Sequence, residues 1–211
     1  MKASGFLPLA AAVLFTCATS ASGGDGEYVQ NRDARIDRAA GECLDMAGRP
    51  IAETIVVKAR RNGRLLAETP CRNGKIDGVV KAYYDNGKPI FESPHERGKR
   101  EGVERIYYEN GALSAEVSFR GGVAHGVARE YYEDGRLKSE FSFERGVPDG
   151  IFKEYYPDGA LKGEVSFHDG KPDGASRAYY PNGKPKEGAV SQDGQPIGET
   201  RRHDENDHPM R

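Results

Sequence analysis

The sequence predicts an all-β fold, in the form of one elongated, single antiparallel sheet of tandem β-hairpin repeats. Three features support this prediction, and each returns every 24 residues without an insertion or deletion. A pair of glycines four residues apart begins each unit, a Tyr-Tyr pair follows, and an Asn-Gly or Asp-Gly turn comes next. A fixed period of this size is typical of solenoid-like arrays in which each unit contacts only its neighbours.

Each full unit is expected to form one hairpin. An Asn-Gly or Asp-Gly turn between two alternating runs is a strong hairpin signal. The Gly-x-x-x-Gly link then turns the chain into the next hairpin. The five full units begin at Gly74, Gly98, Gly122, Gly146 and Gly170.

The turn also predicts the register of the two strands. In Tyr156-Pro157-Asp158-Gly159, proline suits the first central position of a type I turn, and glycine suits the left-handed residue after it. This three-residue loop pairs Tyr155 with Leu161 and, in a regular ladder, Ile151 with Val165. In the second unit it pairs Tyr107 with Leu113 and Val103 with Val117, so one face should collect Val103, Tyr107, Leu113, Val117 and Phe119. The other face should carry the cross-strand pairs Glu130–Lys138 and Glu154–Lys162.

The segments on either side of the full units are less regular. Residues 54–68 read as a worn copy of the hairpin, so residues 50–73 are expected to form an N-terminal cap repeat. Residues 74–198 hold the five repeats, of which the last is weakened by Ala175 and Ser191. Residues 23–49 are interpreted as a linker, and residues 199–211, which show no period, as a disordered tail.

The first 22 residues have the features of a secretory signal peptide. Lys2 precedes an apolar run over residues 6–15, and small residues follow. Ordinary cleavage near Ser20 or Ser22 is one expectation. The alternative is a bacterial lipoprotein acylated at Cys17, which would be tethered to a membrane.

Either form of export leaves two cysteines in the folded part, Cys43 and Cys71. Two cysteines in an exported chain allow a single pairing. A Cys43–Cys71 disulfide would close a loop of about 29 residues and contribute about 3 kcal/mol on the chain-entropy model.

Composition and motifs indicate a binding protein, with no enzymatic activity and no cofactor expected. The net charge of −2 does not favour a nucleic-acid partner. His95, His125 and His168 occupy different positions of their units, so no metal site is predicted. No serine, threonine or cysteine lies in a nucleophile elbow, and the recurring glycines are turn residues.

Two columns of side chains recur in every unit and are the candidate binding surface. The basic column includes Arg105, Arg129 and Lys153, each two residues before a Tyr-Tyr pair. With the first tyrosines it could line a groove for an anionic or carbohydrate-like partner. The preferred explanation is structural: each stem packs along its neighbours while the charged head reaches solvent. The second tyrosines, Tyr108, Tyr132 and Tyr156, are expected on the other face, where their regular spacing could suit a repetitive or flat partner such as a glycan, a cell-wall polymer or a membrane surface. Function is expected chiefly in positions that differ between units, such as Phe152 against Glu104, Ala128 and Ser176.

The repeated unit resembles the MORN repeat. Tyr-Tyr-x-(Asn/Asp)-Gly followed by a Gly-x-x-x-Gly corner is similar to the bacterial variant of that repeat, over about residues 74–198. The resemblance implies an elongated β array that binds proteins or lipid surfaces without catalysis. One branch of the variant family is labelled as antitoxins, which normally meet their toxins in the cytosol.

These observations predict an exported repeat scaffold that binds a protein partner at the bacterial envelope, either secreted or periplasmic, or anchored by lipid. Two alternatives stay open. One is an antitoxin or immunity-type protein that neutralises a cognate toxin. The other is a module that binds the surface of a membrane or of the cell wall.

Overall fold

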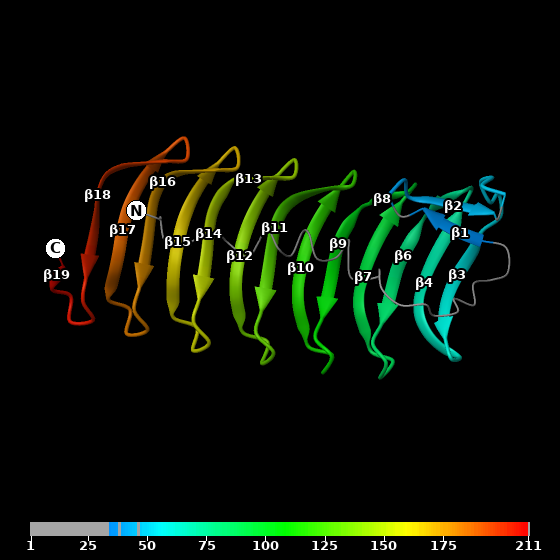
Figure 1. Cartoon of the computed structure of the whole chain (residues 1–211), viewed down its shortest axis with the longest axis horizontal. Coiled ribbons are helices and arrows are strands. Elements are labelled where there is room, and N and C mark those ends of the chain that lie inside the picture. The colour runs from blue at the N-terminus through cyan, green and yellow to red at the C-terminus, as the bar shows by residue number, and fades with distance from the viewer. Residues whose placement is uncertain (1–33, 38, 46, 211) are drawn as a thin grey trace.

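The described residues form one long sheet of side-by-side hairpins (Figure 1). This computed structural model describes residues 34–37, 39–45 and 47–210. The expected signal peptide over residues 1–22, including Cys17, lies outside these residues. In the described part of the chain, nineteen strands belong to one sheet, which confirms the predicted all-β fold. No helix among these residues is both long and apolar enough to cross a membrane.

Three groups of strands make up the sheet. The N-terminal strands are β1 (Ala34–Asp37), β2 (Glu42–Asp45), β3 (Ile55–Arg61) and β4 (Arg64–Arg72). The strands on the first side of each repeat hairpin are β5 (Lys75–Ile76) with β6 (Gly78–Tyr83), β8 (Lys99–Arg100) with β9 (Gly102–Tyr107), β11 (Val123–Tyr131), β13 (Val147–Pro148) with β14 (Gly150–Tyr155), β16 (Lys171–Tyr179) and β18 (Gln195–His203). The return strands are β7 (Pro89–Glu96), β10 (Leu113–Arg120), β12 (Leu137–Glu144), β15 (Leu161–His168), β17 (Pro185–Gln192) and β19 (Pro209–Met210).

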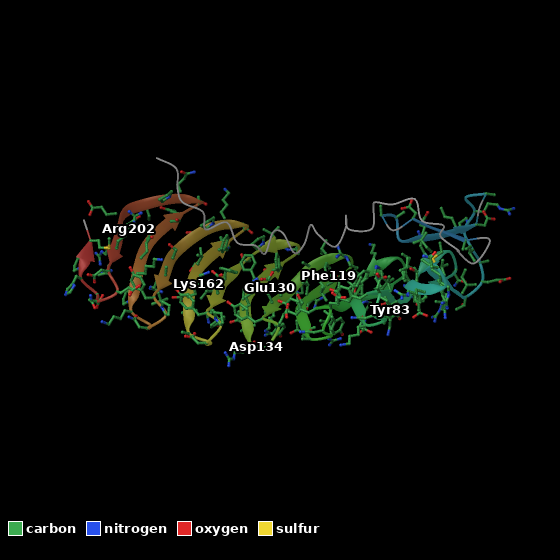
Figure 2. The ribbon with its side chains drawn as sticks, turned by 60° about the horizontal axis from the view of Figure 1, so that its bottom comes forward. Tyr83, Phe119, Glu130, Asp134, Lys162 and Arg202 are labelled. Atoms are coloured by element: carbon green, nitrogen blue, oxygen red, sulfur yellow. A yellow bond between two sulfur atoms is a disulfide. The ribbon has the colours of Figure 1, made fainter. Side chains whose placement is uncertain are left out.

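From β3 onward the hairpins follow one another across the sheet in chain order, and every pairing is antiparallel. The strands curve along their length, so the sheet forms an open, concave surface (Figures 1 and 2). The Tyr-Tyr turns lie along one long edge, where Figure 2 labels Asp134, and the glycine corners lie along the other.

Both kinds of turn explain the recurring glycines. The loop after Tyr156 closes as predicted, because the Tyr156 N–H donates to the Ala160 carbonyl at 2.8 Å and Gly159 has φ +92°. At the corner, Arg145 and Gly146 both have positive φ, which is the two-residue turn whose twist matches a hairpin. The Gly146 N–H then donates to the Ala124 carbonyl at 2.7 Å, so successive corners are hydrogen-bonded to one another.

A β-bulge in the return strand of each of the five full units makes part of the predicted register wrong. Tyr155 pairs with Leu161, as predicted, but Lys162 has no paired residue on the partner strand. The ladder therefore shifts by one, so that Phe152 pairs with Val165, and Ile151 pairs with Ser166. The same bulge pairs Val103 with Ser118 instead of Val117. A shift of one residue moves a side chain to the opposite face, and this explains why Ile151 is 51 % exposed while Phe152 is 8 % exposed.

The bulge separates the side chains into two distinct faces. The face that carries Ala115, Val117 and Phe119 of β10, all of which are buried, is called the core face. The face that carries Arg105 and Glu116 is called the charged face. Val103, Tyr107 and Leu113 lie on the charged face, so the predicted set of five apolar residues is divided between the two faces.

A β-hairpin closes the N-terminal end of the array, where the sequence predicts a linker over residues 23–49. Strands β1 and β2 pair with each other, and β2 also meets β5 through Glu42 and Lys75. The predicted disulfide joins Cys43 to Cys71, and both cysteines are buried beside Ala34, Val57 and Ile76 in a small core. The disulfide thus ties this hairpin to the cap repeat formed by β3 and β4.

The C-terminal end of the chain continues the array, where the sequence predicts a disordered tail over residues 199–211. Strand β18 reaches His203, and β19 pairs back onto it through Arg202 and Met210. Asp204 supports the turn between them, because its Oδ1 accepts hydrogen bonds from the backbone N–H groups of Asn206 and His208, each at 2.9 Å. Counted after the cap repeat, this segment is a sixth, divergent copy of the hairpin, without the Tyr-Tyr pair and the Asn-Gly or Asp-Gly turn of the five full units.

Candidate binding surface

The charged face carries alternating rows of cations and carboxylates. We call Lys81, Arg105, Arg129, Lys153 and Arg177 the cation column, and Glu68, Glu92, Glu116, Glu140 and Glu164 the acid column. In the ladder the first four cations each lie between two glutamates of neighbouring strands, as Arg105 lies between Glu92 and Glu116. Arg177 has Glu164 on one side and Gly188 on the other. The closest ion pairs are Lys81–Glu92 and Arg177–Glu164, each 2.8 Å between nitrogen and oxygen.

Hydrogen bonding between the cation column and the acid column shifts the pKa values of several groups. The bond from Lys81 raises the pKa of that lysine and lowers the pKa of the Glu92 carboxyl. The first tyrosine of each pair joins the rows, since the Tyr83 hydroxyl donates to Glu68 at 2.7 Å and the Tyr131 hydroxyl to Glu116 at 3.0 Å. Burial, followed by the bond to Glu68, raises the pKa of Tyr83 to about 12.

The candidate cations are therefore placed in a compensated network. Arg129 reaches Glu116 at 3.3 Å and Glu140 at 3.8 Å, and Lys153 reaches Glu140 at 4.0 Å. An alternating row with a carboxylate beside each cation presents little net charge to an anionic partner. The ion pairs of Arg129 and Lys153, and the position of Arg105 between Glu92 and Glu116, favour the structural interpretation of these cations over an anion-binding groove.

The second tyrosines face away from the cations and connect consecutive repeats. The hydroxyls of Tyr108, Tyr132 and Tyr156 each donate to the backbone carbonyl of the first tyrosine in the next unit, at 2.6, 2.7 and 2.9 Å. Tyr180 makes the same bond to the His203 carbonyl at 2.9 Å, which extends the column into the sixth hairpin. These rings are half-buried, and their polar atoms are engaged within the array.

The core face differs from unit to unit. One position of each first strand, two residues after the second corner glycine, carries Val80, Glu104, Ala128, Phe152 and Ser176, which we call the variable column. In the middle of the sheet this face is aromatic: the Phe141 ring lies edge-on to Phe143, Phe152 and Phe167, with centroid separations of 5.0, 5.4 and 5.2 Å. The variable column therefore determines how well each part of the core face is filled.

Glu104 interrupts the apolar core face toward the N-terminus. This carboxylate is 6 % exposed and accepts a short hydrogen bond of 2.5 Å from the Ser93 hydroxyl. Arg100 lies 3.9 Å from Glu104 and also 3.9 Å above the centre of the Phe119 ring. A buried carboxylate needs such partners, and together these residues separate the N-terminal core from the phenylalanine cluster.

A hollow of about 70 Å³ opens on the core face next to the phenylalanine cluster, between β14 and β17. Phe152, Gly163, Val165, Ser176 and Ala178 line it. Three glutamates and Arg177 also belong to its lining, and Arg177 is paired with one of them, Glu164, at 2.8 Å. The other two are Glu154 and Glu187. Glu154 is bound to Lys162 at 2.7 Å, while Glu187 is 3.7 Å from Arg202. The predicted ion pairs Glu154–Lys162 and Glu130–Lys138 are present, the latter at 3.6 Å. The prediction that they lie opposite the apolar face is wrong, because the bulge places Gly163 and Ser139 directly opposite these glutamates and puts both glutamates on the core face.

The histidines stay apart in the structure. The His95 Nδ1–H donates a hydrogen bond to the Ser93 carbonyl at 2.9 Å, and burial lowers the pKa of this imidazole. His168 lies 3.0 Å from Asp149 at an exposed corner. Among the residues that the structure describes, no group of three or more histidine, cysteine or acidic side chains is arranged to hold a metal ion.

The repeat is also recognised by comparison with known families. The model for the MORN repeat variant matches residues 76–96, 100–120, 124–145, 148–169 and 172–187. The chain belongs to the MORN repeat family. These repeats form scaffolds that often bind membranes or proteins, and they are generally not catalytic. No curated protein matches this chain.

In this MORN array, sequence reasoning missed the hollow and the sixth hairpin. The sequence does indicate the hollow, because the large Phe152 of one unit is replaced by the small Ser176 in the next, and neighbouring positions also become smaller in that unit. The sixth hairpin had a weaker signal: Arg201 lies one period after Arg177, and Pro209 one period after Pro185.

Proposed function

We propose that this protein is an exported, non-catalytic scaffold at the bacterial envelope that binds a protein partner through the core face of its sheet. The variable column is the observation that supports this function. The turns, corners and charged rows repeat because every hairpin needs them, whereas Val80, Glu104, Ala128, Phe152 and Ser176 differ in size and polarity. A sequence of distinct positions along one face suits a partner that is itself non-repetitive, as a protein is.

The disulfide supports export. Cys43 and Cys71 are fully buried against each other, and stable disulfides of this kind form in oxidising compartments. The apolar N-terminal run provides the expected export signal.

Cell fractionation with thiol alkylation tests export. We expect the chain in the envelope or extracellular fraction, shortened by about 16 to 22 residues, with Cys43 and Cys71 protected from alkylation until a reductant is added. Recovery of the full-length chain from the cytosol with Cys43 and Cys71 as reactive thiols would refute export and would favour the antitoxin alternative. Labelling with a fatty acid, in the native chain and in Cys17→Ser, separates lipidation from ordinary cleavage.

Site-specific photocross-linking in the native host tests protein binding. A photoreactive amino acid at position 176 reports on the core face, and one at position 142 is the control, because Ser142 pairs with Val127 on the charged face. We expect a defined protein adduct from position 176 and none from position 142. The proposal fails if neither position gives an adduct, or if both give the same one. Sedimentation of the purified protein with lipid vesicles, without any protein adduct in cells, would identify a membrane-surface module in its place.

A further inference from the structure

The hollow on the core face corresponds to a phenylalanine ring that the repeat pattern lacks. One unit earlier, the equivalent space lies beside Phe141 and is filled by Phe152, whose ring meets Phe141 edge-on at 5.4 Å. In the next unit Val165 stands in place of Phe141, and Ser176 in place of Phe152. The same step replaces Ser139 by Gly163 and Glu154 by Ala178.

These four replacements all remove volume from one spot, while the backbone keeps the spacing of the repeat. Neighbouring strands hold that spacing through their ladder hydrogen bonds, so the sheet does not collapse into the space. The remaining hollow of about 70 Å³ has one wall formed by Phe152. It is smaller than a cavity of about 150 Å³ that encloses benzene, but it is open to solvent, so a ring can enter with one edge and leave the other outside.

The residues at the border of the hollow favour a positively charged group beside any aromatic ring that enters it. Glu187 is 40 % exposed in its side chain, and its only ion-pair contact among the described residues is the loose one to Arg202 at 3.7 Å. Glu154 is more enclosed and already bound by Lys162. A cation next to the inserted ring would therefore find an available carboxylate in Glu187.

We propose that this hollow is a docking site for one aromatic side chain of a protein partner, with a lysine or arginine adjacent to it in the partner's surface. This inference rests on the proposed protein-binding function, and it names the part of the core face where the partner is anchored. Buried aromatic anchors of this kind dominate many protein interfaces. The ring would restore the edge-to-face contact that Phe152 otherwise lacks on the side of Ser176.

Small probes test the hollow without the partner. Chemical-shift changes of the Val165 methyl groups are followed while 2-phenylethylammonium or phenylacetate is added to the full chain. Both probes carry a phenyl ring, and they differ in the sign of the charge. We expect saturable binding in the millimolar range, with the ammonium probe favoured by roughly threefold to fivefold, the range typical of one exposed ion pair. Glu187→Gln should remove most of that preference.

Filling the hollow should abolish binding. Ser176→Phe places a ring in the position that Phe152 occupies in the preceding unit. Ala178→Leu fills the hollow from a second position, so the test does not fail if one of the two substitutions prevents folding. The matched control is Ser142→Phe, which adds the same ring on the charged face. Far-UV circular dichroism confirms that each variant is folded.

Several results would overturn the docking site: equal binding of the two charged probes, no saturable shift at Val165, or unchanged binding in folded Ser176→Phe and Ala178→Leu. If the probes fail while position 176 still cross-links to a protein, the docking site is wrong and the proposed function stands. If the probes bind as expected but position 176 gives no adduct in cells, the proposed protein-binding function is wrong, and with it the identity of the occupant.

Discussion

The β-bulge in each repeat can be tested by comparing alanine substitutions at two adjacent residues, Ile151 and Phe152. Without the bulge at Lys162, Ile151 would lie opposite Val165 on the apolar face and Phe152 would point to the charged face. With the bulge the two exchange places, and only Phe152 contributes to the core. The two variants therefore give opposite results for the two registers.

The expected difference follows from burial. Phe152 is 8 % exposed and lies edge-on to Phe141, and truncating a buried phenylalanine to alanine costs about 3–5 kcal/mol. Because the hollow beside Phe152 already lacks packing, we expect the lower end, about 3 kcal/mol. Ile151 is 51 % exposed, and full burial of such a side chain contributes about 1.5–3 kcal/mol, so its loss should cost about 1 kcal/mol.

Urea unfolding followed by far-UV circular dichroism gives the free energy of unfolding of each variant. Repeat arrays can unfold in parts, so hydrogen exchange of the β14 and β15 amides should accompany it. The bulged register predicts that Phe152→Ala costs about 2 kcal/mol more than Ile151→Ala. An equal cost, or a larger one for Ile151→Ala, would refute the assignment of the two faces.

Three further predictions concern the ends, the tyrosine column and pH. Reduction of the Cys43–Cys71 disulfide should lower the free energy of unfolding by about 3 kcal/mol, since it frees a loop spanning 28 residues, and exchange should increase first in β1 and β2; equal melting temperatures with and without reductant would contradict this. Tyr132→Phe removes the 2.7 Å hydrogen bond to the next repeat and should cost about 1 kcal/mol in urea unfolding, whereas no cost would show that the bond is not needed between repeats. Tyr83 has a folded-state pKa of about 12, above its ordinary value, so its contribution is complete below pH 10 and is lost as the pH rises from 10 toward 12. Thermal unfolding across that range should show this loss in the native chain and a smaller one in Tyr83→Phe.

Much of the fold could be predicted because turns depend on local chemistry. The left-handed glycine at Gly159 and the asparagine or aspartate before it determine the loop whatever surrounds it, as Asp158 shows by accepting a bond from the Ala160 N–H at 2.9 Å. The pairs nearest the turn, such as Tyr155 with Leu161, followed from that loop alone. The disulfide followed from there being a single pairing of the two cysteines.

The bulge could not be predicted because no single residue type marks it in all five full units. Ile90 and Ser114 occupy it in the first two units, and lysines occupy it in the other three, at Lys138, Lys162 and Lys186. What selects the bulge is the packing of the whole core face, which needs Phe141, Phe143 and Phe152 on one side, and this becomes visible only when neighbouring repeats are placed together. The role of the cations in the candidate site could not be predicted for the same reason. Each cation looks available in one unit, and its carboxylate partners come from the adjacent strands.

The position of the hollow links binding to the stability of the C-terminal repeats. Ser176, Ala189 and Ser191 replace larger residues on the core face there, so these hairpins bury less apolar surface than the phenylalanine cluster does. In an array where each unit contacts only its neighbours, the least stable units unfold first. A ligand that binds only the folded hairpins stabilises them by mass action. Occupation of the hollow should therefore slow hydrogen exchange in β16 to β18 more than in β9 to β12, and in the Ser176→Phe variant the added ring should produce the same protection without any ligand.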